Sequence, residues 1–293
     1  MDFNSLLTSA GYNPGQVVVL RHRPTEAPLR RALPWLAIER PDIFNSYQRI
    51  HGPKVERALD KLRGKGYVAS FIGHAAGKAA FVGLYKIEST CLALNHKSFW
   101  KIEEHRELQK LGDRGLTEER DQIIRFDLTE TDFHTPWKGR LVVEWTGGER
   151  SWWRRAHNNQ LAVLAIHEDS LFEAKMPKWN DLALTWNDLR VIPTQWKQAL
   201  AHWRGVYFIY DTTDGKGYVG SAYGADNLLG RWQNYSATGH GGNQLLKARN
   251  PENFVFSILQ RVSPDLDPDE VIRLESSWKL RLHTRNPGGL NDN

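Results

Sequence analysis

The chain has 293 residues, with 39 Lys and Arg against 34 Asp and Glu, so its formal net charge is +5 at pH 7. This length allows two domains that each bury a hydrophobic core. The single cysteine, Cys91, excludes an internal disulfide and a cysteine-rich zinc site, and the lack of an apolar run of about 18 residues or of a basic-then-apolar N-terminus predicts a cytoplasmic protein without a membrane span.

The first sixty-odd residues predict helices and loops, with one short strand at residues 17–20. A cluster of arginines surrounds Pro24 and Pro28, and it consists of Arg21, Arg23, Arg30 and Arg31. Such a cluster forms either a solvated face or a set of contacts to phosphates. These four arginines are therefore candidate DNA-binding residues.

From residue 67 onward the sequence consists of short apolar or alternating runs, separated by glycine or charged turns. The predicted strands are residues 67–72, 79–87, 124–128, 141–145 and 161–166, with a helix inserted at 102–111. This spacing is typical of a small all-β barrel or sandwich. We expect an N-terminal DNA-recognition domain at residues 1–169, with a β-rich core at 67–169.

Two of these segments read Ser-Phe-Ile-Gly-His at 70–74 and Ala-Phe-Val-Gly-Leu-Tyr at 80–85. They resemble strands of the PUA-like barrels, which hold modified or flipped bases. The resemblance implies a base-binding N-terminal domain. An unrelated β-rich DNA-binding domain is the alternative.

Tryptophan is concentrated in the same region, where four residues fall within seventeen positions: Trp137, Trp145, Trp152 and Trp153. Core packing is one interpretation, because tryptophan is mostly buried and adjacent strand residues face opposite sides. The other interpretation is that Trp152 or Trp153 stacks on a base, which is worth ~1–3 kcal/mol per base. The adjacent Arg154 and Arg155 would then hold phosphates.

Residues 170–204 predict a structured helical connector. Apolar residues recur at helical spacing in 186–189 and 194–203, and Pro193 stands where a helix begins. The boundary to a C-terminal domain therefore falls near Arg204.

The stretch 205–220 reads Gly-Val-Tyr-Phe-Ile-Tyr-Asp-Thr-Thr-Asp-Gly-Lys-Gly-Tyr-Val-Gly. An apolar run, a set of turn residues and a second short run predict a β-hairpin. The hairpin brings Tyr207 and Tyr218 close together across the sheet, while the glycines leave the backbone open to close approach.

This hairpin, with its Gly-Val-Tyr and Tyr-Val-Gly units, resembles the signature of the GIY-YIG nuclease family. The later residues that continue the resemblance in order are Arg231, Tyr235, Glu275 and Asn291. The match spans residues 205–293 and implies a small α/β sandwich, in which helices flank a three-stranded mixed sheet. The whole chain is then an α+β protein with two domains.

The resemblance implies that Tyr207 is the general base and that Arg231 binds the scissile phosphate. Tyr218 and Tyr235 would hydrogen-bond the phosphate or order the nucleophile. A guanidinium group matches two phosphate oxygens and keeps its charge. A phenol has a pKa of about 10, so Tyr207 needs nearby positive charge or a metal-bound water to act as a base near neutral pH.

Glu275 would be the sole protein ligand of Mg²⁺ or Mn²⁺, with water and phosphate oxygens completing the coordination. Asn291 would fix the glutamate or the hairpin by hydrogen bonds. His240 lies in a glycine-rich segment and is a further candidate for the site. Many repair-type members have a lysine after Tyr-Val-Gly, and this chain has Ser221 there, so a tie to excision repair is in doubt. Lys216 could take the place of that lysine or not.

The excess of positive charge lies before the hairpin. Residues 205–293 contain nine Lys and Arg against ten Asp and Glu, which leaves 30 against 24 in residues 1–204. The N-terminal part is therefore expected to supply much of the attraction to phosphates.

Together these features predict a Mg²⁺-dependent endonuclease acting on double-stranded DNA, with or without modified bases, in restriction or phage defence. A mobile-element or repair nuclease is the alternative within the same chemistry. A nucleic-acid-binding protein with an inactive nuclease fold is the alternative from another class. Because one such site cleaves one strand, a double-strand break would need a homodimer or sequential events.

Overall fold

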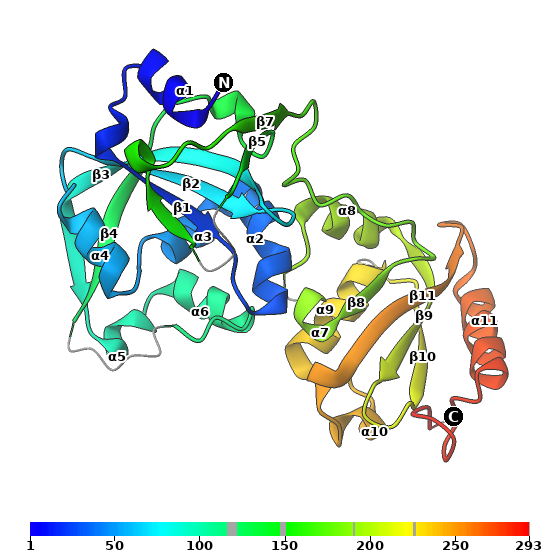
Figure 1. The fold of residues 1–293 in the computed structure, drawn as a ribbon. Helices are drawn as coiled ribbons and strands as arrows, with labels where there is room; N and C mark the ends of the chain where they lie inside the picture. Colours follow the sequence, from blue (N-terminus) through cyan, green and yellow to red (C-terminus); the bar gives the residue numbers. More distant parts are fainter. Residues whose placement is uncertain (116–121, 147–150, 190, 225–226, 293) are drawn as a thin grey trace. The chain divides into compact units, whose positions relative to one another are not determined.

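The structure is a computed structural model, and it describes residues 1–115, 122–146, 151–189, 191–224 and 227–292. The chain divides into two compact units, Met1–Ala174 (unit 1) and Lys175–Asn293 (unit 2) (Figure 1). Within the described residues, no helix is both long and apolar enough to cross a membrane.

Unit 1 is built on one curled seven-stranded sheet. Its strands run in the order β6 (Trp153–Arg155), β1 (Val17–His22), β2 (Tyr67–Gly73), β3 (Lys78–Leu94), β5 (Leu141–Glu144) and β7 (Val163–Ile166), and β4 (Ile123–Glu130) pairs with β3. Only β1 and β2 pair in parallel among these described strands. Parallel neighbours need a crossover, and residues 23–66 supply it.

Strand β1, which lies between β6 and β2, is buried along its whole length because both of its faces are covered. Val17 and Val19 contribute to one apolar cluster, and Val18 and Leu20 contribute to another on the opposite side. The uninterrupted apolar run at the start of this strand is the pattern expected of a strand that is buried on two faces.

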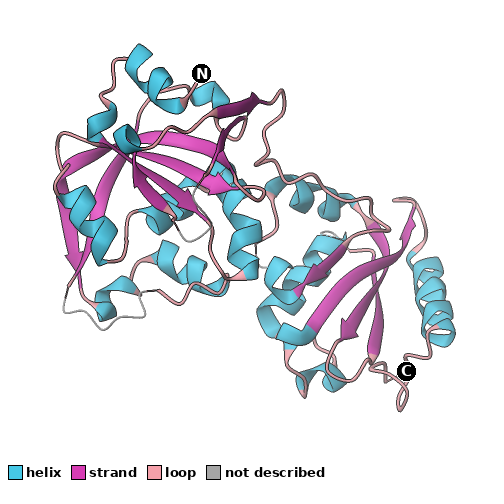
Figure 2. Cartoon of the chain, in the orientation of Figure 1, coloured by secondary structure: helices cyan, strands magenta, loops and turns pink. Residues whose placement is uncertain are grey.

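Helices and short 3₁₀ turns surround this sheet (Figure 2). They are α1 (Phe3–Ser9), η1 (Pro14–Gln16), α2 (Ala27–Glu39), α3 (Pro41–Gln48), α4 (Pro53–Asp60), α5 (His96–Phe99), α6 (Glu103–Lys110), η2 (Thr135–Trp137) and η3 (Ala156–Asn158). α1 packs on the cluster that contains Val17, whereas α4 packs on the cluster that contains Val18. The crossover helices α2, α3 and α4 all have proline in the first turn, where its missing N–H is tolerated.

The predicted strands of this region are confirmed in position, but the all-β sandwich is wrong. A sandwich needs two sheets, and the described strands of unit 1 form a single sheet with helices packed on it. The sheet is also not a closed barrel, since its end strands β6 and β7 do not pair with each other. Unit 1 is therefore α+β, and nothing in its topology supports the PUA-like resemblance.

Unit 2 has a four-stranded sheet in the order β10 (Gly217–Ala222), β9 (Arg204–Asp211), β11 (Phe254–Val262) and β8 (Ala183–Thr185). All three pairings are antiparallel, so the prediction of a three-stranded mixed sheet is wrong. The extra strand β8 comes from the segment that was expected to be a connector. Its three residues pair with Val255, Phe256 and Ser257 of β11.

The helices of unit 2 lie on both faces of this sheet (Figure 1). They are α7 (Trp186–Leu189), α8 (Thr194–His202), α9 (Asn227–Thr238), α10 (Gln244–Lys247), η4 (Pro251–Asn253) and α11 (Pro268–Arg281). One buried core joins this segment to α9. It contains Trp232 of α9 together with Leu182, Leu184, Trp186 and Leu200. Residues 175–204 therefore belong to unit 2 and complete its core.

An ion-pair cluster holds the turn between β9 and β10. The Arg249 guanidinium lies 2.8 Å from a carboxylate oxygen of Asp211 and 2.8 Å from one of Asp214. Asp211 is buried. Burial alone would raise the pKa of Asp211, but the hydrogen bond from Arg249 lowers it below its usual range. The buried carboxylate is therefore ionised and depends on one arginine.

We expect Arg249→Ala to destabilise unit 2 by about 3 kcal/mol, because it leaves the Asp211 charge buried and unpaired. Urea unfolding of the full chain, followed by tryptophan fluorescence, measures this change. Arg273→Ala on the exposed surface of α11 is the matched control and should change stability by less than about 0.5 kcal/mol. Equal stabilities for the two variants would contradict a structural role for the cluster.

Candidate active site

The β9–β10 hairpin places Tyr207 opposite Gly220 in the antiparallel register. A β-carbon on Gly220 would lie 2.4 Å from the Tyr207 hydroxyl oxygen. Only glycine leaves room for the Tyr207 ring to lie across the neighbouring strand. The Tyr-Val-Gly unit therefore fixes the position of the first phenol as well as carrying the second.

Three tyrosines from three elements meet at this point. The ring centroids are 6.5 Å apart for Tyr207 and Tyr218, 6.1 Å for Tyr207 and Tyr235, and 6.2 Å for Tyr218 and Tyr235. The hydroxyl oxygens of Tyr207 and Tyr235 lie 3.1 Å apart and share a hydrogen bond. Tyr207 and Tyr235 are buried, whereas Tyr218 is half-buried, so Tyr218 is the most accessible of the three.

Burial raises the pKa of Tyr207, and the neighbouring Tyr218 raises it further. The hydrogen bond from Tyr235 and the charge of Arg231 act in the opposite direction, while Glu275 adds a smaller increase. Burial also raises the pKa of Tyr235. Both phenols are therefore neutral near pH 7, and Tyr207 lies within the electrostatic reach of one cation and one carboxylate.

Arg231 lies on α9, one turn before Tyr235, and its side chain is exposed. Residues four apart lie on the same helix face, so Arg231 shares a face with Tyr235 while its side chain is open to solvent. This position suits the binding of an anion that approaches from outside.

The loop that follows α9 packs against Tyr235. Gly241 has a φ of +56°, and a β-carbon there would lie 2.5 Å from the Tyr235 ring. The adjacent His240 is half-buried, and its Nδ1 accepts a hydrogen bond from the backbone N–H of Gly242 at 2.9 Å. His240 therefore orders the loop that covers Tyr235, and its own contact with a substrate stays a prediction.

Glu275 is brought to the hairpin by α11, which packs on β10 and β9. One carboxylate oxygen accepts a short hydrogen bond from the Ser221 hydroxyl. The other lies 2.8 Å from the Nζ atom of Lys279. Lys279 is 6% exposed, so this ion pair is largely shielded from water.

Lys279 was not among the predicted site residues. Its spacing of four residues from Glu275 on one helix indicates that the two side chains lie on the same face. Lys279 brings a positive charge to the end of the Tyr-Val-Gly strand, close to Ser221. Lys216 does not do so, because its Nζ atom donates to the Pro287 carbonyl oxygen at 3.1 Å in an exposed position.

Asn291 holds the open edge of β10. Its Oδ1 atom accepts from the Val219 N–H at 3.0 Å, and its Nδ2 atom donates to the Val219 carbonyl oxygen at 2.8 Å. Asn291 is buried, and its own N–H donates to the Thr284 carbonyl oxygen. Asn291 therefore fixes the strand that carries Tyr218.

The predicted DNA-binding residues of unit 1 do not form one surface. Arg21 and Arg154 are buried, with their guanidinium carbons 5.1 Å and 4.4 Å from the centroid of the Trp145 ring. The exposed members of the predicted set are Arg23, Arg30, Arg31, Arg155 and Trp152, and Trp153 is half-buried. Arg21 and Arg154, which were predicted to contact phosphates, thus lie in the interior and pack on Trp145.

Among the described residues, no group of three or more His, Cys, Asp or Glu side chains comes together to hold a metal ion. An all-protein cage is thus not present in that part of the chain. Glu275 offers a single carboxylate, and Mg²⁺ commonly binds through one or two carboxylates while keeping several waters. The donor set therefore fits a hydrated divalent ion that shares Glu275 with Lys279.

No family model matches the chain, and no curated protein matches it. Among solved structures, the chain is similar to the catalytic domain of the homing endonuclease I-TevI, with 25% identity over 31% of this chain and 98% of that domain and a TM-score of 0.26. A mutant of the same catalytic domain gives 25% identity, covers 31% of this chain and 94% of its own, and has a TM-score of 0.26. The function of this chain is therefore inferred from its own site.

Proposed function

We propose that unit 2 is a metal-dependent endonuclease that hydrolyses phosphodiester bonds of DNA. One observation carries the proposal: Tyr207, Tyr218 and Tyr235 meet at the β9–β10 hairpin, where the Ser221 hydroxyl of the same hairpin also donates to the Glu275 carboxylate. Phosphodiester hydrolysis needs an oriented water, a cation for the phosphate and stabilisation of the developing negative charge. The residues around Tyr207 can supply these needs.

In this proposal the exposed guanidinium of Arg231 binds two oxygens of the scissile phosphate. The phosphate then lies beside the half-buried Tyr218, whose hydroxyl donates a hydrogen bond to it. In its ionised form Tyr207 accepts the proton of the attacking water, and Tyr235 holds the Tyr207 oxygen in place through their hydrogen bond. The cation at Arg231 favours the ionised form of Tyr207 and so opposes the effect of burial.

Glu275 would hold Mg²⁺ or Mn²⁺, with the Ser221 hydroxyl orienting the carboxylate. A bound divalent ion would supply Lewis-acid stabilisation of the negative charge on the leaving oxygen. Lys279, on the same helix α11, forms an ion pair with one oxygen of this carboxylate and so partly balances its charge. Asn291 acts indirectly, because it fixes the β10 backbone next to Tyr218.

The biological role that we propose is restriction or phage defence, with unit 1 choosing the DNA site by its sequence or by a modified base. A mobile-element or repair nuclease is the second candidate, and Ser221 in place of lysine disfavours excision repair. An inactive nucleic-acid-binding protein is disfavoured because Tyr207, Arg231 and Glu275 are all present. Since one site cleaves one strand, concerted double-strand cleavage would require two copies of the chain.

Plasmid cleavage tests the proposal. We expect the full chain to cut DNA with Mg²⁺ and not with EDTA, and Arg231→Ala to lower the rate by about 100-fold or more, since it removes the cation that meets the phosphate. Arg273→Ala, an exposed arginine on α11, is the matched control and should cleave at the wild-type rate.

Parallel plasmids with unmodified and modified cytosine separate the candidate roles. Cutting confined to modified DNA would support a modification-dependent restriction enzyme, and discrete fragments from unmodified DNA would support a sequence-specific one. Cleavage that persists in EDTA, or that Arg231→Ala leaves unchanged, would contradict the mechanism.

A further inference from the structure

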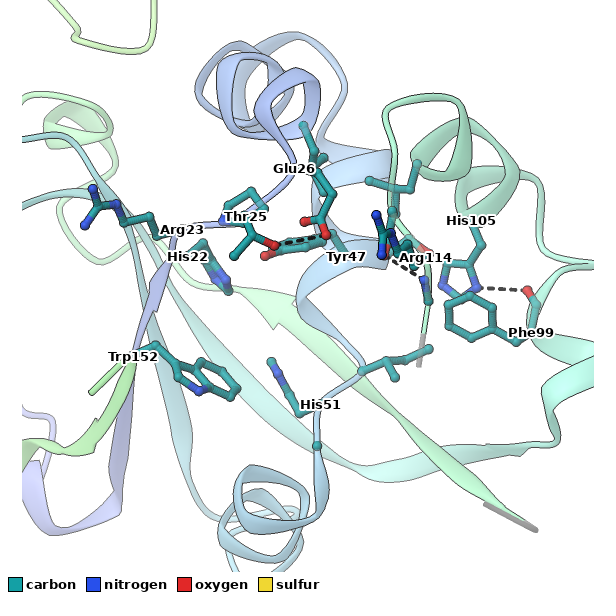
Figure 3. A pocket seen from close by; sticks show the side chains of 18 of the residues that line it. His22, Arg23, Thr25, Glu26, Tyr47, His51, Phe99, His105, Arg114 and Trp152 are labelled. Carbon is teal, nitrogen blue, oxygen red and sulfur yellow. Dashed lines mark hydrogen bonds between the residues drawn. The ribbon is translucent and has the colours of Figure 1, made fainter. Parts of the chain in front are cut away.

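Unit 1 contains a cavity of about 500 Å³ that the proposed chemistry of unit 2 does not use. It lies where the end of β1 meets the end of α3 and the residues before β6. His22, Tyr47, His51 and Trp152 line it, and Figure 3 shows the Trp152 indole and the two imidazoles around one space. The volume is in the range of about 300–1,000 Å³ that is usual for small-molecule sites.

The ring systems of this wall are uncharged near pH 7. Burial lowers the pKa of His22 to about 3, with a further contribution from His51, and burial lowers the pKa of His51 to about 4. Burial raises the pKa of the Tyr47 phenol. The cavity therefore offers neutral hydrogen-bonding groups and aromatic faces, which suits an uncharged planar ring with polar edges.

Several buried polar atoms of the lining residues have no hydrogen-bond partner within the described part of the chain. Among them are Nε2 of His51 and Oγ of Ser46, and both residues are at least nine-tenths buried. A buried polar atom without a partner costs free energy, so such atoms in a native fold call for an explanation. A ligand with donors and acceptors on its edge would provide the missing partners.

Trp152 presents an aromatic face at the side of the cavity. Its side chain is 38% exposed, and its ring centroid lies 5.9 Å from that of His51. Its carbonyl oxygen accepts a hydrogen bond from the Arg21 N–H at 2.7 Å, which extends the pairing of β6 with β1. The sheet therefore holds the indole beside the cavity, where a planar ring can stack on it.

Charged residues also line the cavity, beside apolar ones such as Leu29 and Leu108. Arg23 and Arg114 are exposed, and Glu26 and Asp113 lie near them. The Asp113 carboxylate accepts from the Gly115 N–H at 2.9 Å, and Glu26 accepts from the Thr25 hydroxyl at 3.0 Å. Carboxylates can accept hydrogen bonds from exocyclic amino groups, and exposed arginines suit phosphates. A polar ring attached to phosphates therefore matches both the neutral aromatic wall and the charged residues of the cavity.

We propose that this cavity binds one nucleobase turned out of a DNA duplex, with the Trp152 indole against its face and the exposed arginines beside its phosphates. The proposal rests on the proposed function in one respect, that DNA is the substrate of the chain. It assigns to unit 1 the recognition of a single extruded base, as enzymes that read flipped bases do by stacking and edge hydrogen bonds. A free nucleotide has the same chemistry, and the experiment separates the two sources.

The test measures binding of the full chain, in EDTA, to labelled duplexes that carry one base opposite an abasic position. Each of the four bases and 5-methylcytosine is placed there in turn, and the fully paired duplex is the reference. An unpaired base needs the least free energy to leave the duplex stack. We expect at least one of these duplexes to bind about tenfold more tightly than its fully paired counterpart.

Trp152→Ala should abolish most of this roughly tenfold preference, because it removes the stacking surface. Ser46→Ala should also reduce it while leaving the melting temperature unchanged or higher, since it deletes an unpaired buried hydroxyl. Trp137→Ala is the control, because this indole stacks on His134 and does not line the cavity. The preference should survive in that variant.

Equal affinity for the fully paired duplexes and those with an unpaired base would overturn the proposal, and so would an undiminished preference in Trp152→Ala. Tight binding of deoxynucleoside monophosphates without any duplex preference would assign the cavity to free nucleotides and also overturn it. Because no cleavage is needed, the two proposals fail separately. A chain that cuts DNA but shows no preference keeps the nuclease function, and one with the preference but no cutting keeps only the base site.

Discussion

Glu275→Gln is expected to lower the rate of DNA cleavage by about a thousandfold or more, because it removes the carboxylate that is proposed to hold the divalent ion. The neutral amide keeps an oxygen that can accept from the Ser221 hydroxyl, so the side chain should stay in place. DNA binding in EDTA should change by less than about threefold, since phosphate contacts elsewhere provide most of the affinity. Plasmid cleavage and duplex binding are measured on the same preparation.

The Glu275→Gln variant can also lose stability, because Glu275 pairs with the buried Lys279. A second substitution separates this effect from the loss of catalysis. Glu275→Gln leaves the Lys279 ammonium, which is 6% exposed, without its carboxylate, and this can destabilise unit 2. The double variant Glu275→Gln with Lys279→Met removes both charges and should recover the stability, yet it should remain inactive. Glu270→Gln, exposed in the first turn of the same helix, is the control and should cleave normally.

Two outcomes would contradict a catalytic role for Glu275. Loss of DNA binding together with cleavage would indicate that the carboxylate is structural. Recovery of cleavage in the double variant would indicate that the single variant failed only because the Lys279 charge had lost the Glu275 carboxylate.

The sequence predicted the hairpin and most strands of unit 1 because their apolar runs are bounded by glycine and charged turns. It did not predict β8, a strand of three residues that is too short to show a period. Its pairing with β11 is decided by tertiary contacts such as Leu184 against Phe256. For the same reason the connector could not be assigned to unit 2 in advance, since its helical pattern does not say which core it covers.

The candidate site shows the same limit. Order along the chain identified Tyr207 and Glu275, but which groups contact the carboxylate depends on how α11 packs on the sheet. In unit 1 the segment 152–155 left two interpretations open: core packing of the indoles, or one indole stacked on a base with Arg154 and Arg155 at phosphates. The structure has the Arg154 guanidinium inside, on the Trp145 ring, and Trp152 exposed at the cavity. Strand alternation predicts that neighbours point to opposite sides, but it does not say which side is covered.

Tyr207→Phe is expected to lower the cleavage rate by about a thousandfold, because it removes the proposed proton acceptor. The substitution keeps the ring that fits against Gly220 and deletes only the hydroxyl, so the fold should lose about 1 kcal/mol from the broken bond to Tyr235. Tyr210→Phe, on the same strand and 40% exposed, is the control and should leave cleavage unchanged.

The pH profile separates a base from a positioning residue. Burial raises the pKa of Tyr207, so its ionised fraction is small at neutral pH and increases as the pH rises. If that form accepts the proton, wild-type activity should rise by about tenfold per pH unit between about pH 6 and pH 9, and the residual activity of Tyr207→Phe should be nearly flat. A residual activity with the wild-type slope would assign the titration to another group. Tyr207 would then only hold the attacking water by a hydrogen bond. The proton of that water would pass instead to a group bound with the substrate.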